Sequence, residues 1–416
     1  MLRRWTDLLG DAYDIYQSAG RTALAHGALR YMRQRLPTEL WPPLLLDPYH
    51  AADETVSLHD TPSIQLEYDG RHRESLPGQL AAAEGRIPAA DGHVCVYDDA
   101  EVVGRRPIVK VNGRYFPPSW LGVDTAFFIH QEKYLRRNLP VTWPLQRAIL
   151  DSRPERSVDT GFLLLGERSH EFPAWHHEVL PKLRWLEEYE QATGESPTLI
   201  VSADLTSFHE ESLQLMGYDP DSWVESDDNG IQVGRLVIPP HPLRAKGTHL
   251  HTSPHDWVAD RILSNVSAPT AEFSDRIYIS RQDADRRHIE NEKAVRDALA
   301  ADGFEWYEPG RLSYEEEVQL FAGAEHIVGA HGKGLASMFY AEDATLLELF
   351  PERGGTEHYF LTAHECGFEY DFLTGEPIPA DQNIRPRDRD FVVDIDTLQS
   401  RVSNLVDPAK PDPVEP

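Results

Sequence analysis

The sequence has 416 residues, which at about 150 residues per domain predicts two or three domains. Asp and Glu number 69 against 40 Lys and Arg, and the resulting formal net charge of −29 argues against general binding to nucleic acid or to anionic membranes. The two cysteines, Cys95 and Cys366, are too few and too far apart for a disulfide framework or a thiolate zinc site.

Arginine supplies 33 of the 40 positive charges, and lysine only seven. An acidic, lysine-poor surface tolerates its own repulsion where salt screens it, so we predict a halophilic protein of a salt-rich cytoplasm. The sequence shows no export signal and no apolar run near the ~20 residues of a membrane span. We therefore expect a cytoplasmic protein, with peripheral contact at the inner face of the membrane as an alternative.

Residues 1–36 are predicted to form an amphipathic helical segment. Apolar residues such as Trp5, Leu8 and Leu9 recur three and four positions apart and define one stripe. Six arginines and three aspartates give this segment a charge of plus 3 within the acidic chain. The segment is therefore expected either to make a weak membrane-surface contact or to pack on the body of the protein.

Residues 37–155 are predicted to form a β-rich N-terminal region. Short alternating or β-branched runs, such as 63–68, 94–97 and 108–111, are separated there by Gly, Pro and Asp. None of these runs has the spacing of a catalytic or metal-binding motif.

From residue 156 onward, predicted strands alternate with predicted helices, which indicates parallel α/β layers. We assign residues 156–245 and 246–400 to two Rossmann-like domains, joined through the His- and Pro-rich linker 240–254. The first has strands at 162–165, 198–201 and 236–238, with helices at 175–191 and 210–216. The second has strands at 276–279, 304–307, 326–329 and 345–349, with helices at 289–300, 314–322 and 334–340. Residues 401–416 are predicted to be a disordered tail.

A glycine-rich turn in the second α/β set is the most informative segment. The apolar strand 326–329 runs into His331-Gly332-Lys333-Gly334-Leu335, where a helix is expected to begin. Glycines let a backbone approach a ligand closely, and the free N–H groups of a helix start favour a phosphate. Lys333 adds a positive charge. A purely structural tight turn is the alternative interpretation.

Polar residues follow the neighbouring strands of the same set. Ser280 and Arg281 end the strand 276–279, and a guanidinium there can reach a pyrophosphate. Arg287 and Asn291 stand at the start of the next helix. For Arg287, an ordinary solvated helix charge is the alternative. Glu348, near the end of the strand 345–349, has the position of an acidic group that receives ribose hydroxyls, or of a buried paired carboxylate.

Ser280-Arg281 with Arg287, Asn291 and Glu292, the segment 331–335, and Glu348 with Pro351 together resemble the donor-domain signature of glycosyltransferase family 61. The resemblance covers roughly residues 158–352. It implies a GT-B architecture, with an acceptor-side domain at 156–245 and a donor domain at 246–400 facing a cleft. It also implies inverting transfer from a nucleotide-diphosphate sugar without an obligatory metal. In that setting Arg281, His331 and the glycine turn hold the diphosphate, and Glu348 holds the ribose.

The segment from Trp175 to Pro181 resembles the acceptor-side helix of that family, in which a His precedes an acidic residue by four positions. Here that position is Ala174. Inverting transfer needs a base that takes the proton of the acceptor hydroxyl. Glu178 matches the acidic position and is the first candidate, with His176 or His177 as the second. Solvated polar residues at a helix start are the alternative interpretation.

The sequence therefore predicts an enzyme, an inverting glycosyltransferase that moves a sugar from a nucleotide-diphosphate sugar to a glycan, lipid-linked or protein acceptor. A nucleotide-sugar epimerase and a noncatalytic scaffold that keeps the fold are the alternatives. Asp283-Ala284-Asp285 has the spacing of a metal-chelating pair, but such triplets arise by chance among 69 acidic residues. No metal and no further cofactor is predicted.

Overall fold

The computed structural model of the chain describes the following residues: 51–58, 63–87, 92–103, 108–116, 154–166, 168–227, 229–240, 244–245, 249–250, 255–268, 272–352, 354–379 and 384–406. The predicted helical segment 1–36, most of the linker 240–254 and the tail beyond residue 406 lie outside these ranges. The predicted boundaries of the domains stay predictions.

The first sheet has eight strands in the order β6-β5-β4-β10-β7-β8-β9, with β1 paired to β4. Its bounds are β1 (Glu54–Ser57), β4 (His93–Val103), β5 (Ile108–Val111), β6 (Arg114–Phe116), β7 (Arg156–Leu163), β8 (Thr198–Ser202), β9 (Trp223–Ser226) and β10 (Ile231–Ile238). Strands β10, β7, β8 and β9 are parallel, whereas β4 pairs antiparallel with β10. The strands of the predicted β-rich region thus extend the first α/β set in one sheet.

The second sheet has six strands in the order β14-β13-β15-β16-β17-β18. Its bounds are β13 (Arg276–Ile279), β14 (Glu305–Tyr307), β15 (His326–Ala330), β16 (Thr345–Pro351), β17 (Glu369–Pro377) and β18 (Phe391–Val392). All neighbours are parallel except β17 and β18. The strand order reverses between β13 and β15, and open α/β sheets bind ligands beside such a reversal, at the carboxyl ends of the strands.

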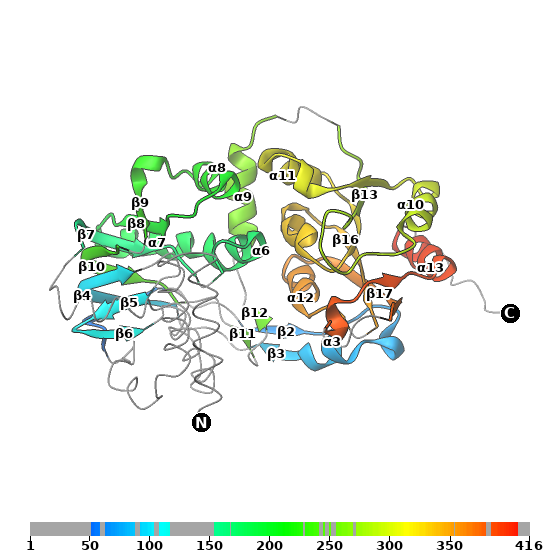
Figure 1. The fold of residues 1–416 in the computed structure, drawn as a ribbon, viewed down its shortest axis with the longest axis horizontal. Helices are drawn as coiled ribbons and strands as arrows, with labels where there is room; N and C mark the ends of the chain where they lie inside the picture. The colour runs from blue at the N-terminus through cyan, green and yellow to red at the C-terminus, as the bar shows by residue number, and fades with distance from the viewer. Residues whose placement is uncertain are drawn as a thin grey trace, which may run out of the picture.

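Helices accompany both sheets, which stand side by side in Figure 1 with the first at the left. Their bounds are α6 (Phe172–Ala174), a π-helical turn η6 (Trp175–Val179), α7 (Lys182–Thr193), α8 (Ser207–Leu215), α9 (His255–Asn265), α10 (Glu292–Ala301), α11 (Tyr314–Ala322), the 3₁₀ helix η9 (Lys333–Tyr340), α12 (His358–Glu365) and α13 (Ile395–Val406). The predicted α/β class is confirmed. No described helix combines the length and the apolarity that crossing a membrane requires.

Two predicted elements differ in the structure. The helix expected over 175–191 is divided into η6 and α7, because Pro181 has no N–H to donate and the main chain before it closes a wider turn, from Leu180 N–H to the Trp175 carbonyl. Residues 401–406 are not part of a disordered tail. They end α13, whose Val402 and Leu405 are buried against the second sheet.

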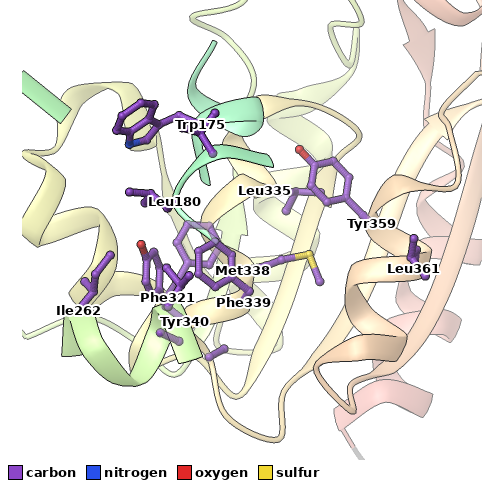
Figure 2. Packing of buried hydrophobic residues seen from close by; sticks show 14 of the residues in the cluster. Trp175, Leu180, Ile262, Phe321, Leu335, Met338, Phe339, Tyr340, Tyr359 and Leu361 are labelled. Atoms are coloured by element: carbon purple, nitrogen blue, oxygen red, sulfur yellow. The ribbon is translucent and has the colours of Figure 1, made fainter. Parts of the chain in front are cut away.

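One apolar core joins the two halves of the molecule. Figure 2 shows Trp175 and Leu180, from the η6 side, near the η9 residues Met338 and Phe339. The hairpin of β2 (Ile64–Leu66) and β3 (Gly85–Ile87) and the helix α3 (Gly78–Ala83) belong to the same core. Their Tyr68 ring packs edge-on against Phe360 of α12. This shared core fixes the loops of both sheets relative to one another.

Candidate active site

A cavity of about 890 Å³ lies where the carboxyl ends of the parallel strands of both sheets meet. Its walls are segments that follow β7, β13, β15, β16 and β17, within 168–178, 281–287, 331–333, 355–359 and 385–388, together with Phe208 of α8. Seven Arg and Lys side chains and six carboxylates line it, whereas acidic residues far outnumber basic ones in the whole chain. The cavity lining therefore repels an anion less than the acidic chain as a whole does.

Arg281 packs directly on the glycine turn. Its side chain is largely buried, its Nε donates a hydrogen bond to the Arg286 carbonyl oxygen at 3.1 Å, and it lines the cavity. A Cβ atom built on Gly332 would lie only 1.5 Å from Nη1 of Arg281. The guanidinium and the turn, predicted to share one pocket, are thus in contact, and residue 332 must be glycine for the guanidinium to lie there.

Arg287 brings a second guanidinium to the same wall. Its backbone has a φ of 60°, a left-handed conformation that non-glycine residues rarely adopt. Its Nε is buried and has no hydrogen-bond partner among the described residues. Burial, and then repulsion from Arg287, lower the pKa of Arg281 to about 10. Arg281 is buried and Arg287 half-buried, and two guanidiniums that repel each other in such a place are stabilised by an anion that binds both.

His331 follows β15 at the edge of the cavity and is held from behind by Glu348. The Nδ1–H of His331 donates to Oε1 of Glu348, and the Tyr370 hydroxyl donates to Oε2 at 2.7 Å. Glu348 is fully buried and is not among the described residues that line the cavity. Glu348 is predicted to contact the ribose. In the structure, however, both of its carboxylate oxygens accept hydrogen bonds from side chains of the protein.

Of the other residues of the glycine turn, some line the cavity and others pack in the core. Lys333 is exposed and lines the cavity. A Cβ on Gly334 would meet Ile279 Cγ2 at 3.0 Å, so this glycine lets the turn lie close to β13. Leu335 is fully buried in the core against Gly329. Of the predicted ligand-binding residues 331–335, the first three thus face the cavity.

Ser280 and Asn291 are also predicted ligand-binding residues, but the structure turns their side chains to other partners. Ser280 is buried and donates its hydroxyl to Glu292 Oε1 at 2.7 Å. Asn291 donates to the Val393 carbonyl oxygen at 2.7 Å and accepts from the Val393 N–H at 3.0 Å. Neither belongs to the described cavity wall. Both fix the segment that carries Arg281 and Arg287.

Glu178 lines the opposite wall of the cavity. Its carboxylate is buried and accepts a hydrogen bond from the Arg168 guanidinium, which favours the ionised form. One turn further, Lys182 is buried and donates to the Leu165 carbonyl oxygen at 2.7 Å. Burial lowers the pKa of Lys182 to about 8, and the nearby Glu178 carboxylate opposes that shift. Glu178 is therefore a carboxylate, paired with Arg168, that reaches the cavity.

The other two candidate bases, His176 and His177, are fully buried, and both nitrogens of each ring are engaged. His176 Nδ1–H donates to the Phe172 carbonyl oxygen at 2.8 Å, and its Nε2 accepts from the Tyr314 hydroxyl at 2.9 Å. Burial lowers the pKa of His176 to about 3, so the ring is neutral. Neither histidine belongs to the described wall of the cavity.

His177 instead connects the two halves. Its Nε2–H donates to the Ala336 carbonyl oxygen of η9 at 2.9 Å, and its Nδ1 accepts from His255 Nε2 of α9 at 2.7 Å. Burial lowers the pKa of His177 as well. Among the three candidate bases, Glu178 alone reaches the cavity of the described structure.

Sequence reasoning missed several residues of the cavity wall: Arg168, His358, Tyr359, Arg385 and Arg387. Tyr359 is buried, and its hydroxyl donates to the Gly332 carbonyl oxygen, which fixes the glycine turn from a third strand end. Arg168, His358 and Tyr359 follow the predicted strands 162–165 and 345–349, and that position could have indicated them. Arg385 and Arg387 follow β17, a strand that was not predicted. The described residues contain no group of three His, Cys or carboxylate side chains suited to a metal ion.

In the comparison with known proteins, residues 172–347 match the family model described as Glycosyltransferase 61. The matched range begins at α6 and ends within β16, so it includes Glu178, Arg281 and His331 but not the cavity-lining segments 168–171, 355–359 and 385–388. The family implies a glycosyltransferase with donor and acceptor substrates and does not favour the epimerase alternative. No match was found among curated proteins. The segment that supplies Glu178, Arg281 and His331 is thus similar to glycosyltransferase family 61.

Proposed function

We propose that the protein transfers a sugar from a nucleotide-diphosphate sugar to a hydroxyl acceptor, with inversion at the anomeric carbon. One observation carries the proposal: Glu178 lines one wall of a cavity whose other wall holds Arg281 against Gly332. A base and an anion site that face one space are what a direct displacement requires. The two sets of parallel strands, whose carboxyl ends border this cavity, support a GT-B arrangement of two Rossmann-like domains.

The donor binds at the second sheet in this proposal. Arg281, Arg287 and Lys333 supply positive charge to the diphosphate, and His331 and the main chain of Gly332 supply further donors. These groups are worth most in the transition state, because negative charge grows on the leaving diphosphate as the anomeric bond breaks. Mutual repulsion between the buried Arg281 and the half-buried Arg287 disfavours the ligand-free site and is relieved when an anion binds.

The acceptor binds at the first sheet. Its hydroxyl oxygen forms the new bond to the anomeric carbon, and its proton passes to the Glu178 carboxylate. The bond from the anomeric carbon to the diphosphate oxygen breaks, and its electron pair stays on that oxygen. Ala174, in place of the histidine usual in the family, also lines the cavity and supplies no proton-accepting group. The proposed base is therefore Glu178 rather than a residue at position 174.

The location, salt adaptation, metal requirement and acceptor of the enzyme are proposed from the sequence. We propose a cytoplasmic, halophilic enzyme that needs no metal and acts in glycan or glycoconjugate biosynthesis. Its acceptor is a glycan, a lipid-linked sugar or a protein. A lipid-linked acceptor is consistent with the basic segment 1–36, which lies outside the described residues.

A donor screen tests the proposal. Thermal shift with UDP, GDP and ADP sugars in concentrated salt identifies the donor, and NMR then follows that donor with and without candidate acceptors. We expect acceptor-dependent release of nucleoside diphosphate and a product of inverted anomeric configuration. Conversion of the sugar without any acceptor would instead support the epimerase. Failure of every nucleotide sugar to bind would refute the proposal.

A further inference from the structure

Two buried side chains behind the cavity, Glu348 and Tyr370, have no role in the proposed reaction so far. Glu348 stands on β16 and Tyr370 on β17, and neither side chain belongs to the described cavity wall. The Glu348 carboxylate is fully buried, and a buried carboxylate is costly unless hydrogen bonds satisfy it. Its two oxygens take their bonds from His331 and from Tyr370.

We propose that Glu348, held by Tyr370, is the positioning residue for His331, which in turn donates a hydrogen bond to the leaving diphosphate. The proposal rests on the proposed function. Because Nδ1–H of His331 is committed to Glu348, the other ring nitrogen, Nε2, is the one left for the cavity. In the protonated ring Nε2–H is a donor, and the carboxylate behind it stabilises the imidazolium charge.

The backbone fixes the same geometry. The His331 N–H donates to the Leu349 carbonyl oxygen at 2.8 Å, so the parallel register of β15 and β16 continues through His331. The ring also packs edge-on against Tyr359 of α12, with centroids 5.4 Å apart. His331 is therefore held through its main chain, through its ring contact with Tyr359 and through Nδ1, which leaves little freedom in the direction of Nε2.

The charged groups around His331 are consistent with this role. Arg281 packs on the adjacent Gly332 from the β13 side, and Glu348 faces the ring from β16. Tyr359 of α12 donates its hydroxyl to Gly332, and burial raises the pKa of that tyrosine, so it stays neutral. When the anomeric bond breaks, its electron pair goes to a phosphate oxygen that accepts from Nε2–H. The proton stays on the histidine.

In this proposal Glu348 acts through His331 and does not make the ribose contact that the sequence predicts. A ribose contact requires a carboxylate oxygen in the cavity, whereas both oxygens of Glu348 bind side chains of the protein. The two roles give different results when Glu348 is changed to glutamine. Loss of a ribose contact leaves the His331 ring unaltered, and loss of a positioning carboxylate alters its tautomer and its protonation.

The experiment combines ¹⁵N-histidine NMR with titration by UDP, GDP and ADP. The variants are Glu348→Gln and the milder Tyr370→Phe, and the resonance of His331 is assigned from His331→Gln. Glu317→Gln is the matched control, because Glu317 is also a buried carboxylate, but it accepts from Ser337 Oγ at 2.7 Å and does not line the described cavity.

We expect the neutral Nδ1–H tautomer at His331 in the wild-type protein and protonation of both nitrogens when the diphosphate binds. Glu348→Gln is expected to shift the tautomer and to weaken diphosphate binding about tenfold or more, and Tyr370→Phe about threefold. Glu317→Gln should stay within about twofold of wild type, because Glu317 hydrogen-bonds to Ser337 rather than to His331 and does not line the described cavity.

A neutral Nε2–H tautomer in the wild-type protein would overturn the inference, and so would Glu348→Gln binding as tightly as Glu317→Gln. If Glu348→Gln does not fold, Tyr370→Phe decides, and wild-type affinity in that variant overturns the inference. If no nucleoside diphosphate binds the wild-type protein, the proposed function fails and the phosphate role of His331 fails with it. The tautomer distinguishes these failures, because it is measured without any ligand.

Discussion

Replacing Gly332 with alanine is expected to displace the guanidinium of Arg281 without unfolding the protein. The added Cβ would lie 1.5 Å from Nη1 and 2.5 Å from Cζ of Arg281, so the guanidinium must leave its position. The backbone itself tolerates alanine, because Gly332 has an extended conformation with a φ of 163°. The atoms that clash belong to the flexible end of a side chain, and the main chain of the turn can stay in place.

The structure sets the size of the effect. Displacement breaks the Nε hydrogen bond from Arg281 to the Arg286 carbonyl, which lowers the free energy of unfolding by about 1 kcal/mol. In the proposed site it also removes a charge-assisted contact with the diphosphate, which is worth about 1.5 to 3 kcal/mol. Since 1.4 kcal/mol corresponds to a factor of ten, diphosphate affinity should fall about 10- to 150-fold.

Isothermal titration calorimetry with the nucleoside diphosphate measures this fall, and thermal denaturation measures the stability of the same sample. Gly78→Ala is the control, because a Cβ at Gly78, on the short helix α3, meets no atom within 4 Å. That variant should bind as the wild type does. Wild-type diphosphate affinity in folded Gly332→Ala protein would refute the assignment of Arg281 to the anion site.

Three further predictions follow from the same geometry. Arg281→Ala should weaken donor binding by about 1.5 to 3 kcal/mol in calorimetry, and unaltered affinity would contradict its phosphate role. Glu178→Gln should reduce turnover about 100-fold or more while donor affinity stays near that of wild type; full turnover would exclude Glu178 as the base. Burial lowers the pKa of His176 from 6.5 to about 3. Between these two pH values, His176 binds a proton in the unfolded chain but not in the folded protein. As pH falls through this range, the free energy of unfolding of the wild type should fall relative to that of His176→Gln by about 1.4 kcal/mol per pH unit, measured in denaturant titrations. If the free energies of the two proteins change with pH in parallel, the pKa of His176 is not lowered in the folded protein.

Local pattern was sufficient for much of the second α/β set. The strand predicted at 276–279 and the helix predicted at 314–322 have the same bounds in the structure. A short β-branched run fixes the first. The second begins at Ser313, where the Ser313 and Glu316 side chains cap each other's backbone N–H groups, a signal that the sequence itself carries.

The contact of Arg281 with the glycine turn also followed from the sequence, because residues after adjacent parallel strands meet at one edge of a sheet. Long-range pairings did not follow. The antiparallel pairing of β10 with β4 joins segments more than a hundred residues apart, and no local pattern specifies it. The same holds for Arg385 and Arg387, which reach the cavity from a loop beyond β17.

The direction of single side chains was the hardest part to predict. Glu348 has the predicted position near the end of its strand, but successive side chains of a strand point to opposite faces, and sequence alone did not show where His331 and Tyr370 would meet it. Likewise, His176 and His177 stand next to Glu178 in the sequence, yet the π-helical turn buries both and leaves Glu178 at the cavity.

A crystal structure with the bound nucleoside diphosphate tests the central claim most directly. The account predicts that the two phosphates lie between the Arg281 guanidinium and the main chain at Gly332, within hydrogen-bond distance of both, with the cavity at Glu178 open beside them. Phosphates bound at another place, with Arg281 still packed on the turn and bonded only to protein atoms, would contradict it.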